Sequence, residues 1–365
     1  MKVLYDHQIF SRQKYGGISR YFCEIIKYYI AAGDPTVEVA IKYPKNMYFR
    51  SVDKGHTHVN RPWGLDCLLS KPKKINQRVS QRVLRKGDYD LFHPTYHRPY
   101  FLKCLKNKPF VLTIHDLIHE VFQDTYGGAK KAIECKKSLI KRADHIIVIS
   151  LNTKKDLLKY YGVPENKVSV IYDATSLGDL SAETPSDSIP KRYVLFVGGR
   201  RSSKNFQVFL KATVPLLRED EGLRIVCAGG RNFSEQELAL LQSLRVSDRI
   251  LHVLPSDGQM AWLYRHALTL VYPSLYEGFG LPVLEAFSCD CPAIISRRSS
   301  LPEVGGDAAE YIDPESEDSI RSAVQRVIYS QELRESLIAK GRLQNENFSW
   351  GKTAEQTHSV YKQLV

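Results

Sequence analysis

The chain has 365 residues, of which 43% are hydrophobic and 25% are charged. This composition is typical of a folded globular protein, and the length suggests two domains of roughly 150 residues each. No apolar run approaches the ~20 residues that a membrane-spanning helix needs, and the first residues lack the layout of a secretion signal. We therefore expect a cytoplasmic protein.

The net charge of +12 is unevenly distributed along the chain. The first 190 residues hold 31 Lys and Arg against 19 Asp and Glu, whereas the remainder holds equal numbers of the two classes. This asymmetry predicts that the first half meets an anionic partner, such as a phosphorylated ligand, a membrane surface or nucleic acid.

Seven cysteines occur at spacings that fit neither a disulfide framework nor a zinc site. In a cytoplasmic protein such cysteines are kept as reduced thiols. We expect this state for all seven, which are Cys23, Cys67, Cys104, Cys135, Cys227, Cys289 and Cys291.

In the first half of the chain, short apolar runs alternate with helix-length amphipathic segments. Such runs are typical of parallel strands that are buried on both faces. Strands are predicted at Val3–Tyr5, Asp90–His93, Phe110–Ile114, His145–Ser150 and Val168–Tyr172.

A second series of apolar runs predicts strands at Tyr193–Gly198, Leu223–Gly229, Ile250–Leu254, Leu268–Pro273 and Pro292–Ser296. Two such series indicate two α/β domains, each with a doubly wound parallel sheet. We place the domains at residues 1–178 and 191–349, with a Ser-, Asp- and Pro-rich linker at Ala174–Arg192. A helix at about 350–365 is expected to pack back on the first domain.

Ligands of open α/β sheets bind at the carboxyl ends of the strands, so the loops there are the candidate sites. In the first domain, Gly16 and Gly17 precede a helix expected at Ile18–Tyr28, and helix N-termini favour anionic or hydroxyl-rich ligands. His115 follows a strand and can donate to a sugar hydroxyl or a phosphate oxygen. Alternatively, the glycines form an ordinary tight turn and His115 is passive beside a capping Asp116.

In the second domain, the segment Phe196–Phe206 runs from a strand through two glycines to Arg200, Arg201 and Lys204, just before a helix. Glycine freedom, fixed cations and a helix N-terminus together favour a diphosphate. The segment matches neither the dinucleotide-binding G-x-G-x-x-G pattern nor the phosphate loop that ends in G-K-[ST]. The alternative is a solvated basic turn.

The most specific loop is EGFGLPVLE, which begins at Glu277 and ends at Glu285. Gly278 and Gly280 permit tight turns, and Pro282 suits the first turn of a helix. Free N–H groups near Phe279 and Leu281 can donate to phosphate or sugar oxygens. A carboxylate accepts two hydrogen bonds from vicinal hydroxyls, so Glu285 suits a ribose and Glu277 a transferred sugar. A capped helix with two solvated glutamates is the alternative.

The chain resembles the retaining, nucleotide-sugar-dependent glycosyltransferases of family 4 in five segments, taken in order. The segments are YGGISRYF (15–22), TIHD (113–116), VGGRRSSKNF (197–206), EGFGLPVLEA (277–286) and SSLPEVGGDAAEYIDP (299–314). The two glutamates at 277 and 285 are a hallmark of that family. The resemblance implies the GT-B fold, in which two Rossmann-like domains face each other across a cleft.

The resemblance also implies roles for individual residues. Arg200 and Lys204 correspond to the pair that holds the donor diphosphate, although Arg201 competes with Arg200 for that part. Glu285 corresponds to the ribose ligand and Glu277 to the glutamate near the transferred sugar, with backbone donors at Gly278, Phe279, Gly280 and Leu281. His115 corresponds to a histidine that contacts the donor sugar, and Gly16 and Gly17 to a loop near the phosphates. Asp290 stands where family members commonly carry glycine.

Elementary chemistry agrees with this assignment. Negative charge develops on the leaving diphosphate, and fixed cations with helix N–H groups stabilise that charge without a metal ion. No acidic pair of the DxD type follows a strand, so we expect neither a metal nor a cofactor. The resemblance implies front-face attack by an acceptor hydroxyl with retention of configuration. The partners are then a nucleotide-diphosphate sugar, with UDP-glucose favoured over GDP-mannose, and a saccharide or lipid-linked saccharide of polysaccharide biosynthesis.

The segment Lys71–Lys86 has seven basic residues and no acidic one, with Ile75, Val79 and Val83 at helical spacing. It predicts a basic amphipathic helix that docks on anionic lipid at the inner face of the cytoplasmic membrane. The alternative is a solvated face whose apolar stripe packs on its own domain. Nucleic acid is not expected as a partner, because aromatic side chains do not interleave the basic runs.

Two other functions fit the same architecture. A sugar-nucleotide 2-epimerase turns over its donor without an acceptor, and a non-catalytic protein only binds the nucleotide sugar. The fold alone does not distinguish these functions, so they have to be distinguished by the residues of the site.

Overall fold

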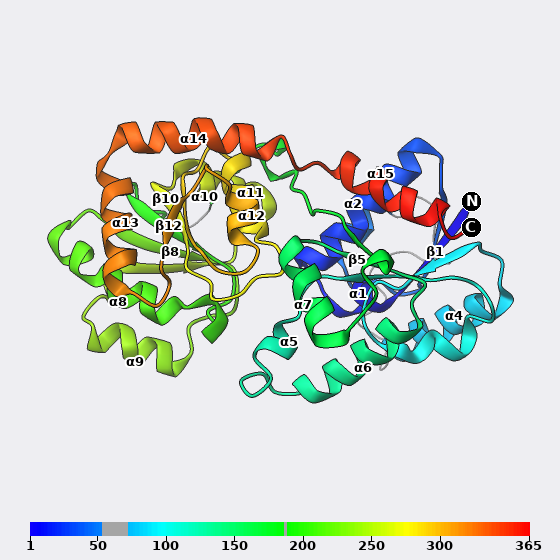
Figure 1. Ribbon diagram of the computed structural model, residues 1–365. Helices are drawn as coiled ribbons and strands as arrows, with labels where there is room; N and C mark the ends of the chain where they lie inside the picture. The colour runs from blue at the N-terminus through cyan, green and yellow to red at the C-terminus, as the bar shows by residue number, and fades with distance from the viewer. Residues whose placement is uncertain (53–71, 186–187) are drawn as a thin grey trace. The chain divides into compact units, whose positions relative to one another are not determined.

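The computed structural model describes residues 1–52, 72–185 and 188–365, which form two compact units. The first unit contains Met1–Asp173 together with Ser349–Val365, and the second contains Ala174–Phe348. In each unit helices flank parallel sheets (Figure 1), as the α/β prediction requires.

The first unit contains two three-stranded parallel sheets, ordered β2-β1-β3 and β4-β5-β6. Their strands are β1 (Lys2–Asp6), β2 (Thr36–Ala40), β3 (Leu91–His93), β4 (Val111–Ile114), β5 (His145–Val148) and β6 (Val168–Val170). A parallel bridge between Phe92 and Phe110 joins the two sheets at β3 and β4. All carboxyl ends of the strands therefore lie along one edge.

The helices of the first unit include one from the far end of the chain. They are α1 (Gln8–Arg12), α2 (Gly17–Ala32), α3 (Met47–Val52), α4 (Pro72–Lys86), α5 (Ile118–Val121), α6 (Ala129–Arg142), α7 (Leu151–Tyr161) and α15 (Trp350–Lys362), with 3₁₀ turns η2 (Pro99–Cys104) and η3 (Glu165–Lys167). Helix α15 packs against α2. The Tyr361 hydroxyl of α15 lies 2.9 Å from the Tyr5 hydroxyl and 2.6 Å from Nδ1 of His93, so polar contacts in the core anchor this helix.

The second unit has one six-stranded parallel sheet, ordered β12-β11-β10-β7-β8-β9. Its strands are β7 (Tyr193–Val197), β8 (Arg224–Ala228), β9 (Ile250–Val253), β10 (Thr269–Tyr272), β11 (Ala293–Ser296) and β12 (Glu310–Ile312). Its helices are α8 (Phe206–Glu219), α9 (Glu235–Ser243), α10 (Asp257–His266), α11 (Leu281–Ser288), α12 (Leu301–Gly305), α13 (Glu317–Tyr329) and α14 (Gln331–Asn345), with 3₁₀ turns η4 (Leu177–Asp179), η5 (Ser202–Lys204) and η6 (Ser247–Arg249).

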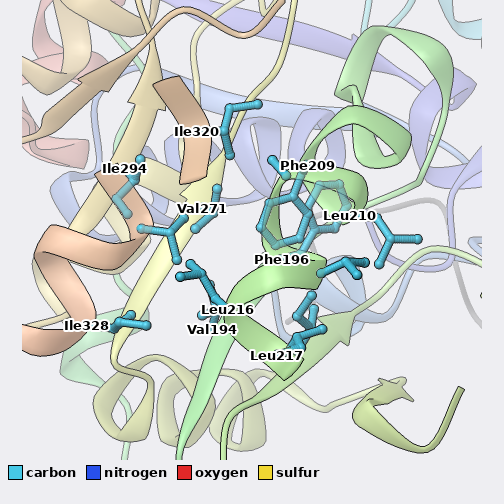
Figure 2. Packing of buried hydrophobic residues seen from close by; sticks show 14 of the residues in the cluster. Val194, Phe196, Phe209, Leu210, Leu216, Leu217, Val271, Ile294, Ile320 and Ile328 are labelled. Carbon is cyan, nitrogen blue, oxygen red and sulfur yellow. The ribbon is translucent and has the colours of Figure 1, made fainter. Parts of the chain in front are cut away.

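The core of the second unit lies between its sheet and the helices α8 and α13 (Figure 2). Phe196 of β7 and Phe209 of α8 stack with ring centroids 5.6 Å apart, and Val271 of β10 packs in the same cluster as Ile320 of α13. Burying such side chains contributes about 1.5–3 kcal/mol each. This packing holds the central strands β7 and β10 rigid, and the candidate loops follow these strands.

Two strands, β2 and β12, were missed by the sequence analysis. Strand β2 alternates, with Glu38 between buried Val37 and Val39, and β12 has only three residues. Neither is a continuous apolar run, which was the pattern used to identify strands.

The predicted boundary at residue 178 is wrong, because Ala174–Leu180 packs on the second unit. A Cβ atom on Gly178 would lie 2.2 Å from the carbonyl oxygen of Ser288 in α11. Arg265 of α10 donates to the carbonyl oxygens of Gly178 and Leu180 at 2.8 and 3.1 Å. Small residues and free carbonyl groups allow this close packing, so a polar composition did not make the segment a free linker.

Six cysteines lie in the described part of the chain, and all are free thiols, whereas Cys67 lies outside the described residues. Within that part, no helix is both long and apolar enough to cross a membrane.

Candidate active site

The loop from β7 to α8 brings Lys204 to the carboxyl edge of the second sheet. Strand β7 ends at Val197, and Gly198 takes a φ of 102°, a left-handed conformation that favours glycine. The 3₁₀ turn η5 then ends at Lys204, directly before α8. The glycine turn and the short helical turn thus fix the direction in which this cation leaves the sheet.

Lys204 contacts the last residue of the neighbouring strand β10 and one residue of the loop that follows it. Its Nζ atom lies 2.6 Å from Oε1 of Glu277 and donates to the Tyr272 hydroxyl, also at 2.6 Å. The Lys204 side chain is 23% exposed and that of Glu277 is 13% exposed, so solvent only partly screens the pair. Burial, with the nearby Glu277 carboxylate, raises the pKa of Tyr272 and keeps the phenol neutral.

The structure places Arg200 away from this pair. Its Nε atom donates to Oε1 of Glu237 at 2.9 Å, and its guanidinium lies 4.4 Å from the ring centroid of Phe233. The side chain is only 1% exposed. Burial opposes the charge on Glu237, but hydrogen bonds from the Ser234 backbone and Arg200 outweigh burial and lower its pKa. Arg201, in contrast, is exposed.

Helix α11 begins where the glycine motif predicts, at Leu281. Gly280 has a φ of 112°, and a Cβ atom there would lie 2.6 Å from Cδ2 of Leu301, so both conformation and space require glycine. The Ser300 hydroxyl donates to the carbonyl oxygens of Glu277 and Phe279, at 3.0 and 2.7 Å. These bonds hold residues 277–280, including Gly278, in one conformation at the start of α11.

Glu285 lies one turn into α11 and accepts a hydrogen bond from the Tyr264 hydroxyl of α10 at 2.9 Å. Tyr264 is completely buried, and burial with the Glu285 charge raises its pKa. The tyrosine therefore stays neutral and acts as a donor that orients the carboxylate.

Two predicted groups lie in the first unit. His115 follows β4, is 6% exposed, and packs against the edge of Tyr21 with centroids 5.0 Å apart. Burial lowers the pKa of His115 to about 3, so the ring is neutral, and its Nε2 atom has no hydrogen-bond partner among the described residues. Gly16 and Gly17 begin α2, where Gly17 starts the helix one residue before the predicted Ile18.

The structure thus brings Lys204, which precedes α8, into direct contact with Glu277, which precedes α11, whereas Arg200 bonds to Glu237 of α9. Several contact residues were missed. Tyr272 was identified only as the end of a strand, and Ser300 only as part of a motif. Glu237 and Tyr264 gave no sequence signal, because they come from other helices. No group of three or more His, Cys, Asp or Glu side chains that could hold a metal ion occurs among the described residues.

Comparisons with known proteins match both halves of the chain. Residues 15–177 match the family described as Glycosyltransferase Family 4, and residues 185–344 match glycosyl transferases group 1. The O-antigen chain mannosyltransferase B of Escherichia coli is 30% identical over 74% of this chain and 74% of its own length. The chain belongs to the group 1 glycosyltransferases. Another such glycosyltransferase, the O-antigen chain mannosyltransferase RfbU of Salmonella typhimurium, is 30% identical over 68% of each chain.

Solved structures show that this glycosyltransferase has the GT-B fold. Sucrose-phosphate synthase from Thermosynechococcus elongatus superposes with a TM-score of 0.75 at 20% identity, covering 100% of this chain and 98% of the other. Anabaena HepE in complex with UDP-glucose gives 0.75 at 17% identity, covering 100% of both chains. At such identities these neighbours show the fold alone.

Proposed function

We propose that this group 1 glycosyltransferase transfers a hexose, with retention and without a metal ion, from a nucleotide-diphosphate sugar to a hydroxyl of a glycan or lipid-linked saccharide. The setting is polysaccharide biosynthesis on the cytoplasmic side of the membrane. The observation that carries the proposal is the contact between Lys204 and Glu277 at the carboxyl edge of the second sheet. A cation for a leaving phosphate and a carboxylate for sugar hydroxyls stand there within one hydrogen bond of each other.

Lys204 and the N-terminus of α11 supply the positive potential for the leaving group. In the absence of a ligand, Glu277 and the Tyr272 hydroxyl hold the ammonium in place. A bound diphosphate competes for it and gains charge as the glycosidic bond breaks, so the attraction is stronger in the transition state than in the ground state. Glu277 is then available to the hydroxyls of the transferred sugar.

The remaining roles follow from burial and hydrogen bonding. Glu285, oriented by Tyr264, binds the ribose hydroxyls. His115 donates or accepts at a sugar hydroxyl, because its buried Nε2 atom has no partner in the described structure. Arg200 holds its loop through Glu237, so we assign the arginine contact with the diphosphate to the exposed Arg201.

The reaction needs no group beyond these residues and the two substrates. The acceptor oxygen attacks the anomeric carbon from the face on which the diphosphate leaves. The bond between the anomeric carbon and the diphosphate oxygen breaks, and its electron pair stays on the phosphate. The hydroxyl proton passes to that phosphate oxygen. Because attack and departure take place on the same face of the sugar, the configuration is retained.

We propose GDP-mannose as the donor, ahead of UDP-glucose. The O-antigen relatives at 30% identity are both named mannosyltransferases, whereas the structure with UDP-glucose shares only 17% identity. UDP-glucose, favoured from the sequence, becomes the second candidate.

The proposal is tested by product analysis with GDP-mannose or UDP-glucose and EDTA, offering methyl hexosides and lipid-linked saccharides as acceptors. The expected product is an α-linked mannoside, identified by the one-bond coupling constant between C1 and H1 in NMR, with equal yield with and without EDTA. A β-linkage or loss of yield with EDTA contradicts retention or metal independence. Epimerised donor formed without an acceptor supports the epimerase alternative instead.

A further inference from the structure

A polar cavity lies in the first unit, at the same carboxyl edge of its sheets as Gly16 and His115. Its volume is about 240 Å³, which is smaller than the roughly 300–1,000 Å³ of pockets for drug-sized ligands. Residues that follow β1, residues that follow β3 and the first turn of α4 line it. The cavity therefore suits a small group rather than a whole nucleotide.

The wall of this cavity is strongly cationic. Arg12, Lys73, Lys74 and Arg98 line it, and none of the described residues that line it is acidic. In the described part of the chain, none of these four forms a salt bridge. Arg12 instead packs over the ring of Tyr96, 4.7 Å from its centroid. None of these four charges is thus directly paired with a carboxylate of the described chain.

One carboxylate, that of Asp6, lies completely buried beside the cavity wall. Its oxygens already accept hydrogen bonds from the Thr95 hydroxyl at 2.7 Å, from Nε2 of Gln8 at 2.8 Å and from the Tyr100 hydroxyl at 2.9 Å. This carboxylate is therefore saturated by neutral donors. It also offsets only one of the four positive charges.

The wall also contains a buried donor without an acceptor. The ring of His7 is 7% exposed, and its Nε2 atom has no hydrogen-bond partner in the described structure. Its other nitrogen, Nδ1, lies 3.2 Å from the Ser11 hydroxyl. Burial lowers the pKa of His7, so the ring is neutral and carries a single proton.

A chain of hydrogen bonds favours one of the two ring nitrogens for that proton. The backbone N–H groups of Lys42 and Tyr43 donate to Oδ1 of Asn76 at 3.1 and 2.9 Å, so the amide nitrogen of Asn76 is the atom that donates to the Ser11 hydroxyl oxygen at 2.8 Å. The Ser11 hydroxyl proton is then free to point at Nδ1 of His7. We therefore place the proton on Nε2, as an unsatisfied buried donor, with Nδ1 accepting from the Ser11 hydroxyl.

We propose that this cavity binds a phosphoryl oxyanion through the Nε2–H group of His7 and the four surrounding cations. An unsatisfied buried donor is destabilising, and an oxyanion removes that cost while pairing with Arg or Lys in charge-assisted bonds. The residues that line this cavity all belong to the first unit, whereas Lys204 and Glu277 belong to the second. Resting on the proposed function, we assign the anion to a phosphate ester of the acceptor saccharide.

The test measures binding of inorganic phosphate and of a hexose 1-phosphate by calorimetry, with saturating GDP present or absent. We expect hexose 1-phosphate to bind, and Arg98→Gln to weaken it at least tenfold. Arg85→Gln, which removes an exposed arginine of α4 outside the cavity, serves as the matched control and leaves binding unchanged. If hexose 1-phosphate binds more tightly than inorganic phosphate, the anion belongs to the acceptor saccharide. If the two affinities are equal, the ligand is free phosphate.

A second measurement uses the wild-type protein, so it does not require a variant to fold. The ¹⁵N spectrum of the His7 ring is expected to show a neutral Nε2–H tautomer whose proton signal shifts on adding phosphate. Absence of binding, equal binding by the Arg98→Gln protein, or an Nδ1–H tautomer overturns the proposal. Failure of GDP to bind contradicts the proposed function alone, because the phosphate titration is carried out separately.

Discussion

At the scale of single residues, the proposed chemistry depends most on Lys204, which was predicted from its place after a strand and two glycines. Its partners could not be predicted in the same way. Contact between Lys204 and Tyr272 requires β7 and β10 to be neighbours in the sheet, and they are separated by two strands in sequence. The contact of Arg200 could not be predicted for a similar reason, because its partner Glu237 comes from α9, beyond the next strand.

Replacing Lys204 with alanine is expected to lower the transfer rate about 10²–10³-fold, as for loss of one group that stabilises developing charge. Steady-state rates with the identified donor measure this effect. Lys211→Ala, at an exposed position on α8, is the matched control and is expected to keep its full rate. A Lys204→Ala protein that stays folded and transfers at the normal rate would exclude this residue from the chemistry.

Asp290 shows how a departure from a family pattern can be compensated. The residue takes a φ of 57°, where glycine is favoured, and its carboxylate accepts two hydrogen bonds from Arg342 of α14 at 2.7 and 2.8 Å. The guanidinium lowers the pKa of Asp290. Both side chains are at least half exposed, so the pair contributes at most about 1 kcal/mol.

Asp290→Ala is therefore expected to destabilise the protein by about 1 kcal/mol more than Asp290→Gly. Both variants lose the ion pair, but only alanine keeps the cost of a left-handed backbone. Thermal denaturation of the two variants measures the difference. Equal melting temperatures would show that the backbone conformation carries no cost here.

At the scale of elements, the helices and strands with long, regular patterns were predictable, whereas β2 and β12 were too short or too polar. Helix α15 illustrates a further limit. Its amphipathic pattern predicts a helix, but the hydrogen bonds of Tyr361 with Tyr5 and His93 join parts of the chain hundreds of residues apart. Such pairings require the fold and are not encoded in local spacing.

The buried His93 predicts how stability changes with pH. Burial lowers its pKa to about 3, below the roughly 6.5 of an unfolded chain. Between these values the unfolded state binds more protons, so stability is complete above about pH 6.5 and falls as the pH decreases toward 3, by up to about 1.4 kcal/mol per pH unit for this group.

Melting temperatures between pH 4 and 7 test this expectation. The wild-type protein is expected to lose stability on acidification, and His93→Gln is expected to show a shallower slope. His97 and His115, whose pKa values burial lowers to about 4 and 3, retain the rest of the slope in that variant. An unchanged slope would mean that His93 is already protonated in the folded protein.

At the scale of the whole molecule, the α/β class and the family were accessible from sequence, because strand series and loop motifs recur in order. The division of the chain was less accessible. Ala174–Leu180 looks like a linker by composition but packs on α10 and α11. The excess of basic residues in the first half of the chain was also visible in the sequence. Only the structure shows that some of these residues line the cavity beside His7 and others lie on the outer face of α4.

Helix α4 contains most of the basic segment for which lipid docking and a solvated face are the two interpretations. The structure describes it from Pro72, while Lys71 lies outside the described residues. Leu84 is buried and Val83 packs against the core of the first unit, so part of the apolar stripe is already covered. The basic side chains of α4 are exposed and can contact anionic lipid. We propose that they hold the enzyme electrostatically to the membrane.

Reversing Arg78, Arg82 and Arg85 to glutamate is expected to lower binding to anionic phosphatidylglycerol vesicles at least about tenfold, since each basic residue contributes about 1 kcal/mol. Sedimentation at low and high salt measures the effect. A control with Lys191, Lys211 and Lys340 reversed has the same charge change in the second unit and is expected to bind normally. Equal sedimentation of both variants would favour the solvated face.

The central claim is that the loops after β7 and β10 bind a nucleotide-diphosphate sugar without a metal ion. Calorimetric titration of GDP and UDP in EDTA tests it most directly, using the wild-type protein, Lys204→Ala, Glu285→Ala and the Lys211→Ala control. The account predicts GDP binding by wild type and Lys211→Ala, and affinity at least about tenfold weaker in the other two variants. Absence of nucleotide binding in EDTA, or equal affinity in all four proteins, would contradict it.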